Sequence, residues 1–143
     1  MNVASILKAK GQAVTTARPD TTLLDITQKL AAKRIGAIVI VGENGQVTGI
    51  ISERDVIRAI AERGVSALSI PAADVMTRSV VTCQKSHLVD ELMELMTKGR
   101  FRHLPVVEDD SLVGIISIGD VVKNHVAEVE MEVSAMRGYL ATG

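Results

Sequence analysis

The feature that most constrains this chain is an internal repeat. Shifted by 65 positions, residues 49–56 (GIISERDV) align with residues 114–121 (GIISIGDV), and six of the eight positions are identical. Leu23 then aligns with Leu88 in the same register. Similarity that extends this far indicates a tandem duplication of a unit of roughly 60 residues. A unit of that size buries little apolar surface alone, so we expect the two copies to pack together.

Periodicity predicts the order β-α-β-β-α in each unit, a mixed α/β (α+β) fold. β-branched and continuous apolar runs indicate strands, and apolar residues three or four apart indicate helices. In chain order, the expected segments are 13–17, 23–30, 37–41, 46–52 and 56–60, then 80–83, 88–96, 104–107, 112–117 and 121–126. Thr21 or Thr22, and Ser86, offer hydroxyls that can cap the first helix of each unit.

These segments predict the organisation of the chain. We expect a first repeat over residues 1–63, a charge-free linker over 64–73, a second repeat over 74–126 and a C-terminal helical extension over 127–143. The extension carries apolar residues three or four positions apart, and therefore one apolar stripe. Such a stripe suits either a dimer contact or packing against the helix's own domain.

Composition excludes several classes of partner. Only 1% of the residues are aromatic, which leaves nothing from which to build a stacking site for single-stranded nucleic acid. The net charge of −1 attracts neither nucleic acid nor an anionic membrane. No apolar run approaches the roughly 20 residues that span a bilayer, and the first residues lack the pattern of a signal peptide. With a single cysteine, Cys83, the chain is expected to be cytoplasmic.

The repeated Gly-Ile-Ile-Ser-x-x-Asp stretch leads from a buried strand into a helix. Ser-x-x-Asp is a capping box, with Ser52 or Ser117 at the N-cap and Asp55 or Asp120 at the third helical position. The same geometry suits a nucleotide, because a helix N-terminus attracts phosphate and a carboxylate accepts hydrogen bonds from ribose hydroxyls. Spacing alone favours the helix cap over the nucleotide site. Because the motif is present in both repeats, we give the two interpretations equal weight.

The duplicated unit, the two helix-start motifs and the strand of residues 102–107 together resemble a tandem pair of cystathionine-β-synthase (CBS) domains, or Bateman module, of the stand-alone bacterial type. The resemblance implies two pseudo-twofold-related repeats packed through their sheets. It also implies a non-catalytic module for regulation and signal transduction that binds an adenosine nucleotide between its repeats. AMP is the first candidate, with NAD(H) or ATP as others. The implied partners are a second copy, in a homodimer, and an unidentified effector protein. The alternative is a structural homodimerisation module without a physiological ligand.

The resemblance also assigns roles to the motif residues. It implies that Asp55 and Asp120 bind ribose hydroxyls and that Ser52 and Ser117 bind phosphate. Gly119 leaves room for a phosphate chain. We therefore expect the Ser117–Asp120 end to be the better site.

Further candidates surround these motifs. Guanidinium groups pair bidentately with phosphate, which makes Arg34, Arg54 and Arg102 the candidate cations. The resemblance implies that the base and sugar are lined by backbone edges, hydroxyl groups and aliphatic surface from Thr15, Thr16, Thr82, Gly36, Ala37, Ile38, His103, Leu104 and Pro105. We expect no catalytic residue and no metal site, because the three histidines share no ligand spacing and Cys83 has no partner in the sequence.

Overall fold

The computed structural model describes residues 1–142. Its helices and strands, in chain order, are α1 (Val3–Lys10), β1 (Thr16–Ala17), α2 (Leu23–Lys33), β2 (Ala37–Val41), β3 (Val47–Ser52), α3 (Glu53–Arg63), α4 (Val89–Gly99), β4 (His103–Glu108), β5 (Ser111–Ser117) and α5 (Ile118–Thr142). The 3₁₀ helices η1 (Gly64–Ser69) and η2 (Ala72–Asp74) lie between α3 and α4. The mixed α+β fold and the C-terminal helix are as predicted.

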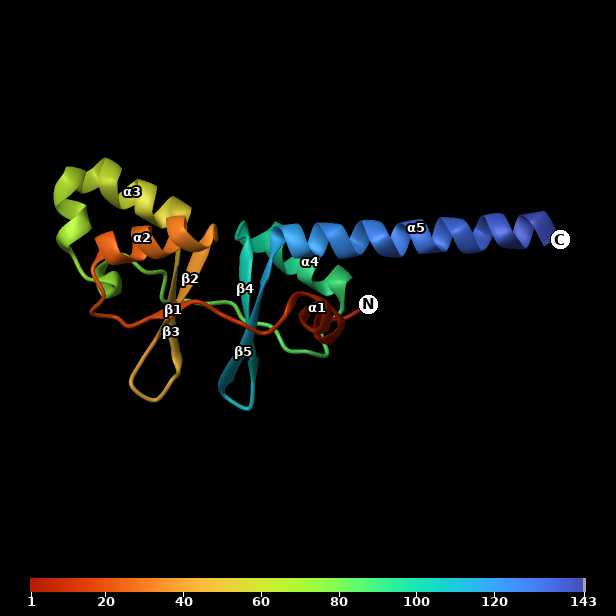
Figure 1. Ribbon diagram of the computed structural model, residues 1–143, viewed down its shortest axis with the longest axis horizontal. Helices are drawn as coiled ribbons and strands as arrows, with labels where there is room; N and C mark the ends of the chain where they lie inside the picture. Colours follow the sequence, from red (N-terminus) through yellow and green to blue (C-terminus); the bar gives the residue numbers. More distant parts are fainter. Residues whose placement is uncertain (143) are drawn as a thin grey trace.

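The two units place their sheets next to each other in the middle of the molecule, with α2 and α3 outside one sheet and α4 outside the other (Figure 1). One sheet has the order β1-β2-β3, and the other pairs β4 with β5. Both hairpins have the same register at their open end, where Ala37 faces Ser52 and His103 faces Ser117. The two Ser-x-x-Asp motifs therefore start from equivalent positions.

The first strand of each unit is shorter than predicted. The expected strand over residues 13–17 is reduced to Thr16–Ala17, and the stretch 80–83 makes only an isolated bridge between Cys83 and Val106. The N-cap of α4 is Leu88 instead of Ser86. Its N–H donates to the carboxylate of Glu91, which starts the helix later than a serine cap would. Thr22 caps α2 as predicted.

Each unit completes its core with the leading segment of the other unit. Val3, Ile6 and Leu7 of α1 are buried among residues of α4, β4 and β5, in the second core. Ala72 and Met76, from the segment that leads into the second unit, are buried in the first core. Backbone hydrogen bonds fix both crossings, from Val89 N–H to the Met1 carbonyl and from Leu23 N–H to the Ile70 carbonyl.

Two equivalent glycines make room for these crossing segments. A Cβ on Gly114 of β5 would lie 2.7 Å from Leu7, and a Cβ on Gly49 of β3 would lie 2.4 Å from Met76. A glycine in a strand often marks the close approach of another segment. The glycine that opens each Gly-Ile-Ile-Ser motif therefore has a packing role.

The segment expected to be a linker is folded. Residues 64–69 form η1, and both Ala67 in η1 and Ala72 in η2 are completely buried. The last helix, α5, runs without interruption through the expected boundary at residue 127. Within residues 1–142, no helix combines the length and apolar composition needed to cross a membrane.

If α1 stabilises the second unit, then Leu7→Ala should lower the free energy of unfolding by about 3 kcal/mol, because Leu7 is 1% exposed and its truncation leaves a cavity. Urea unfolding measures the change. Leu24→Ala on α2 is the control, since Leu24 is 43% exposed and should cost no more than about 0.5 kcal/mol. Equal effects of the two substitutions would show that α1 is not docked.

Candidate functional site

Both Ser-x-x-Asp motifs form complete capping boxes. The Asp55 N–H donates to Ser52 Oγ at 3.4 Å, and the Ser52 N–H donates to Asp55 Oδ2 at 2.9 Å. The equivalent bonds of Ser117 and Asp120 measure 3.2 and 2.9 Å. The structural role predicted for these residues is therefore present in both repeats. In each box one carboxylate oxygen, Oδ2, is used by the cap.

A cavity of about 460 Å³ lies between the repeats beside the first motif. We call it the Ser52–Asp55 cleft. It is lined by Gly36, Ile50, Ser52, Glu53, Arg54, Asp55 and Arg58 of the first unit, and by Thr77, Ser79, Val80, Val81, Gly99, Arg100, Phe101, Arg102 and His103 of the second. Asp55 is only 9% exposed, the most deeply buried charged residue in the described chain.

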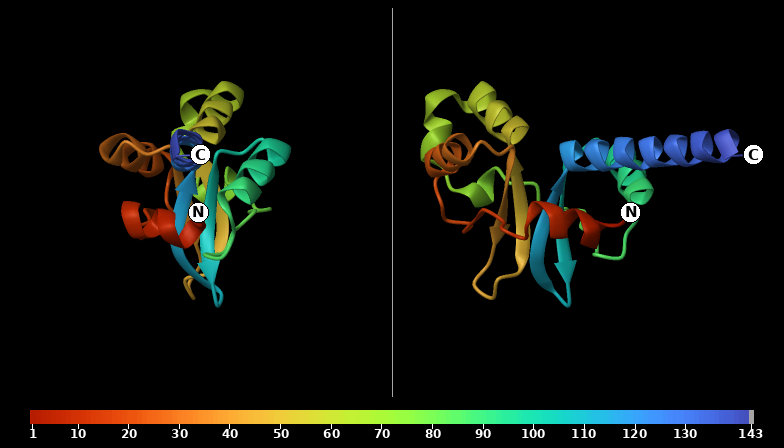
Figure 2. Two further views of the ribbon diagram at one scale, coloured as in Figure 1. Left: turned by 90° about the vertical axis from the view of Figure 1, so that its right-hand side faces the viewer. Right: turned by 45° about the vertical axis from the view of Figure 1, so that its right-hand side comes forward.

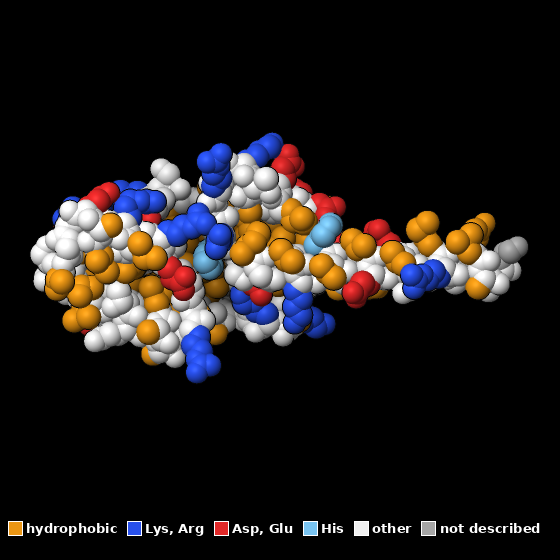
Figure 3. All heavy atoms as spheres, turned by 90° about the horizontal axis from the view of Figure 1, so that it is seen from above, with side chains coloured by type: hydrophobic (Ala, Val, Ile, Leu, Met, Phe, Trp, Pro, Cys, Tyr) orange, Lys and Arg blue, Asp and Glu red, His pale blue; other side chains and the backbone are white. Residues whose placement is uncertain are grey.

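The lining of the cleft combines an excess of positive charge with apolar surface. Arg54, Arg58, Arg100 and Arg102 outnumber its two carboxylates. Lysine and arginine side chains gather near the middle of the helix-bearing face (Figure 3). Ile50, Val80, Val81 and Phe101 supply the apolar surface. The cleft therefore suits an anion with a flat apolar part.

His103 and Gly36 approach each other closely at the mouth of β4. A Cβ on Gly36 would lie 3.1 Å from the His103 ring, so only glycine leaves the ring in place. Burial lowers the pKa of His103, and Lys10 and Arg102 lower it further, against the opposing effects of Glu53 and Asp120. The ring is therefore neutral at pH 7 and able both to donate and to accept a hydrogen bond.

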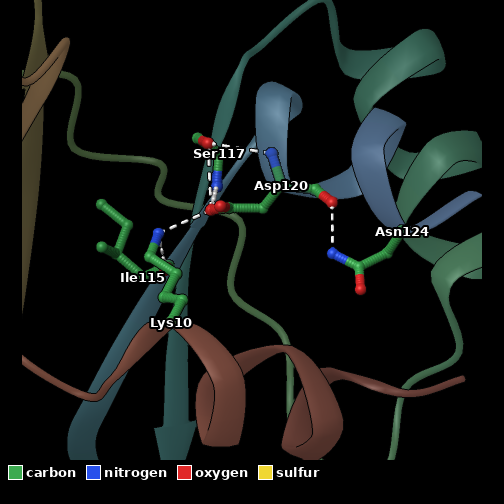
Figure 4. A network of polar contacts seen from close by, with 5 residues as sticks. All are labelled: Lys10, Ile115, Ser117, Asp120 and Asn124. Atoms are coloured by element: carbon green, nitrogen blue, oxygen red, sulfur yellow. Dashed lines mark hydrogen bonds and ion pairs between the residues drawn. The ribbon is translucent and has the colours of Figure 1, made fainter. Parts of the chain in front are cut away.

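The second motif differs because a cation from α1 occupies it. Lys10 Nζ forms an ion pair with Asp120 Oδ2 and donates to the Ile115 carbonyl at 2.9 Å (Figure 4). Burial by itself raises the pKa of Asp120, but the hydrogen bonds from Lys10 and Ser117 outweigh it and hold this pKa below its usual value. Ser117 and Asp120 line neither the Ser52–Asp55 cleft nor a second, shallower groove between α2 and α3.

The cleft brings together six of the residues predicted for the site: Gly36, Ser52, Arg54, Asp55, Arg102 and His103. Arg34 lines a shallow groove between α2 and α3 instead. Ala37, Ile38, Leu104 and Pro105 are buried in β2 and β4, and Ile38 and Leu104 belong to the two cores. The remaining candidates lie outside both cavities: Thr15, Thr16, Thr82, Ser117, Gly119 and Asp120. A Cβ on Gly119 would meet only Ser117 Oγ, at 3.6 Å, so no other segment of the described chain approaches this glycine closely.

Sequence reasoning missed two of the four arginines. Arg58 lies one helical turn after Asp55, and its guanidinium is 3.5 Å from Asp55 Oδ1. Arg100 ends α4 in the left-handed conformation, as Arg34 ends α2. The structure thus makes Arg100 the counterpart of the candidate Arg34, whereas the 65-residue register of the sequence places Gly99 opposite Arg34.

Comparison with known proteins identifies the family. CBS domains match residues 11–62 and 72–126, so the chain belongs to the CBS domain family and carries a tandem pair. It is 34% identical to the mitochondrial CBS domain-containing protein CBSX3 of Arabidopsis thaliana, over 99% of this chain and 72% of that protein. The crystal structure of ATU1752 from Agrobacterium tumefaciens, a CBS-domain containing protein, has 46% identity and a TM-score of 0.83, over 85% of this chain and 91% of that one. The predicted resemblance is confirmed.

Two other similar structures contain ligands. The CBS domain protein PAE2072 from Pyrobaculum aerophilum is complexed with AMP, at 27% identity and a TM-score of 0.75, over 84% of this chain and 89% of that one. The CBS domain pair of MJ0100 is in complex with 5′-methylthioadenosine and S-adenosyl-L-methionine, at 26% identity and a TM-score of 0.80, over 90% and 98%. Both proteins hold adenosine-type ligands.

The Lys10–Asp120 ion pair should make part of the stability dependent on pH. Because folding lowers the pKa of Asp120, the unfolded chain binds more protons in acid, and this contribution is present above the usual aspartate pKa and lost as the pH falls through the folded value. Lys10→Met should therefore destabilise by about 1 kcal/mol at pH 7, with the difference from wild type disappearing in acid. Urea unfolding as a function of pH measures it. Lys8→Met, at an exposed position on the same helix, should have no such effect. A loss that stays constant with pH would contradict the ion pair.

Proposed function

We propose that this chain is a non-catalytic regulatory module that binds an adenosine nucleotide in the Ser52–Asp55 cleft. AMP is the first candidate, and NAD(H) or ATP are the others. One observation carries the proposal: Ser52 and Asp55, at the N-terminus of α3, share a cavity with arginines from both repeats. The adenosine-type ligands of PAE2072 and MJ0100 support this ligand class.

The chemistry of the lining suggests how the ligand is held. Asp55 Oδ2 is used by the cap, so Oδ1, which faces Arg58 at 3.5 Å, is the oxygen available to ribose hydroxyls. The arginine side chains pair with phosphate. The base then lies against aliphatic surface from Ile50, Val80 and Val81, with the ring of Phe101 as the aromatic contribution.

This assignment differs from the expectation that the Ser117–Asp120 end is the better site. Lys10 already neutralises Asp120 through Oδ2, and neither Ser117 nor Asp120 lines the Ser52–Asp55 cleft. We therefore place the main ligand at Asp55. The wider proposal includes a homodimer, an unidentified effector protein and a cytoplasmic location. Regulation requires that the nucleotide bind one arrangement of the repeats, or of the dimer, more tightly than another.

Substitution of the two aspartates separates a ligand site from a helix cap. Asp55→Asn should weaken AMP binding by at least about tenfold, because hydrogen bonds to a charged group are lost. Asp120→Asn disturbs an equivalent capping box and is the matched control, with an expected change of less than about threefold. Thermal shift and calorimetric titration with AMP, ATP, NADH and S-adenosylmethionine provide the measurements.

The same titrations test the alternative function. At a concentration one hundred times the dissociation constant, a ligand stabilises the folded state by about 2.7 kcal/mol, which is readily detected. If none of the four compounds shifts the melting temperature, the chain is a structural homodimerisation module. If Asp120→Asn weakens binding as much as Asp55→Asn does, the ligand is not specific to the Ser52–Asp55 cleft.

His103 should make nucleotide binding depend on pH. Burial holds its pKa low in the free protein, and a bound phosphate beside the ring raises it, so binding takes up a proton. Affinity for AMP should increase as the pH falls from about 8 to about 6, more in wild type than in His103→Gln. The titration of AMP itself is common to both proteins and cancels in the comparison. Identical pH profiles would show that no phosphate lies near His103.

A further inference from the structure

The second half of α5 projects away from the rest of the molecule as a single helix (Figures 1 and 2). Every residue from Val129 to Thr142 is exposed. At 1.5 Å per residue, this part is about 21 Å long. An isolated helix of this length is marginal in water, so a helix that projects in this way needs packing from another element.

Helix α5 carries a regular apolar stripe that continues into its projecting part. Its members are spaced alternately by four and three residues: Val122, Val126, Val129, Val133, Met136 and Leu140. All six are between 41% and 73% exposed. Alternating spacing of this kind is the a/d pattern of a coiled coil, with Val126, Val133 and Leu140 at a and the other three at d. Val121, which is fully buried against the second core, lies outside the stripe.

We infer that α5 forms a parallel two-stranded coiled coil with α5 of a second copy of this chain. The inference goes beyond nucleotide binding and gives a location to the homodimer of the proposed function. The occupant is assigned from the charges that flank the stripe. In a parallel pair, Glu132 at position g lies opposite Arg137 at position e of the other copy.

An antiparallel pair is disfavoured by the same charges. When two antiparallel helices pair their six stripe residues in reverse order, Glu130 lies near Glu130 of the other copy and Glu132 lies near Glu132 of the other copy. Lys123 then lies near Arg137. Like charges across an interface exclude wrong arrangements, so the sequence of α5 selects the parallel one.

Two methionines on α5 provide a matched test of the stripe. Met136 is in the stripe and 65% exposed, whereas Met131 is on the opposite face and 68% exposed. In sedimentation experiments over a concentration series, the wild-type chain should reach twice its mass of 15.2 kDa. Met136→Asp should weaken the dimer by at least about 100-fold, because it buries unpaired carboxylates. Met131→Asp should change it by less than about threefold.

Charge exchange tests the direction of the helices. E132K and R137E should each weaken the dimer, and the double variant should restore it, because the g–e′ pair is re-formed with reversed signs. In an antiparallel pair, residues 132 and 137 of the two copies do not face each other, so the double variant should not restore the dimer. Circular dichroism confirms that each variant keeps its helical content.

Three results would overturn the inference. One is a chain that stays monomeric at every concentration, and another is equal disruption by Met131→Asp and Met136→Asp. The third is a dimer that Ile57→Asp disrupts and that the double variant E132K/R137E does not restore. Ile57 lies in the groove between α2 and α3, so this result would place α5 in that groove of the other copy. AMP binding by Met136→Asp is measured in parallel. Absence of AMP binding by the wild-type chain refutes the nucleotide proposal alone, and absence of self-association by the wild-type chain refutes the coiled coil alone.

Discussion

The structure depends on the exchange of leading segments between its two repeats. Leu7 packs over Gly114 in the second unit, and Met76 packs over Gly49 in the first. Each crossing buries apolar side chains that the receiving unit lacks, which is how two small units obtain two complete cores. The two repeats therefore complete each other's cores. Because α1 crosses in this way, it also delivers Lys10 to Asp120, so the packing arrangement determines the chemistry of the site.

The two motifs show how identical local structure can carry different functions. Ser52–Asp55 and Ser117–Asp120 make the same capping hydrogen bonds, so the local free energy of starting a helix does not distinguish them. Their surroundings do. Asp55 shares a cleft with four arginines, whereas Asp120 is neutralised by one lysine. A nearly symmetric fold thus presents two unequal sites. This difference is the reason for assigning the nucleotide to the Ser52–Asp55 cleft.

Sequence reasoning predicted the elements better than it predicted the site. Repetition and periodicity located most of the elements, because both depend on local pattern. The strand expected over residues 80–83 does not form. Two backbone hydrogen bonds at Cys83 are the only strand-like pairing in this segment. In the site, Gly36, His103 and Arg102 were named through the resemblance to the CBS family, which carries them over together with the adjoining strands. The preference for Asp120 was based on Gly119, and it took no account of Lys10, which lies 110 residues earlier in the chain.

By itself, the sequence determined the duplication, the family, the two capping boxes and the apolar stripe of α5. Each of these is a relation between residues at fixed spacing, and spacing is preserved in any fold that contains the same helices and strands. Only the tertiary structure decided which motif faces an open, positively charged cleft and which stripe is left without packing. Those properties depend on segments far apart in the chain, such as α1 and α5, and local sequence patterns do not specify where such segments meet.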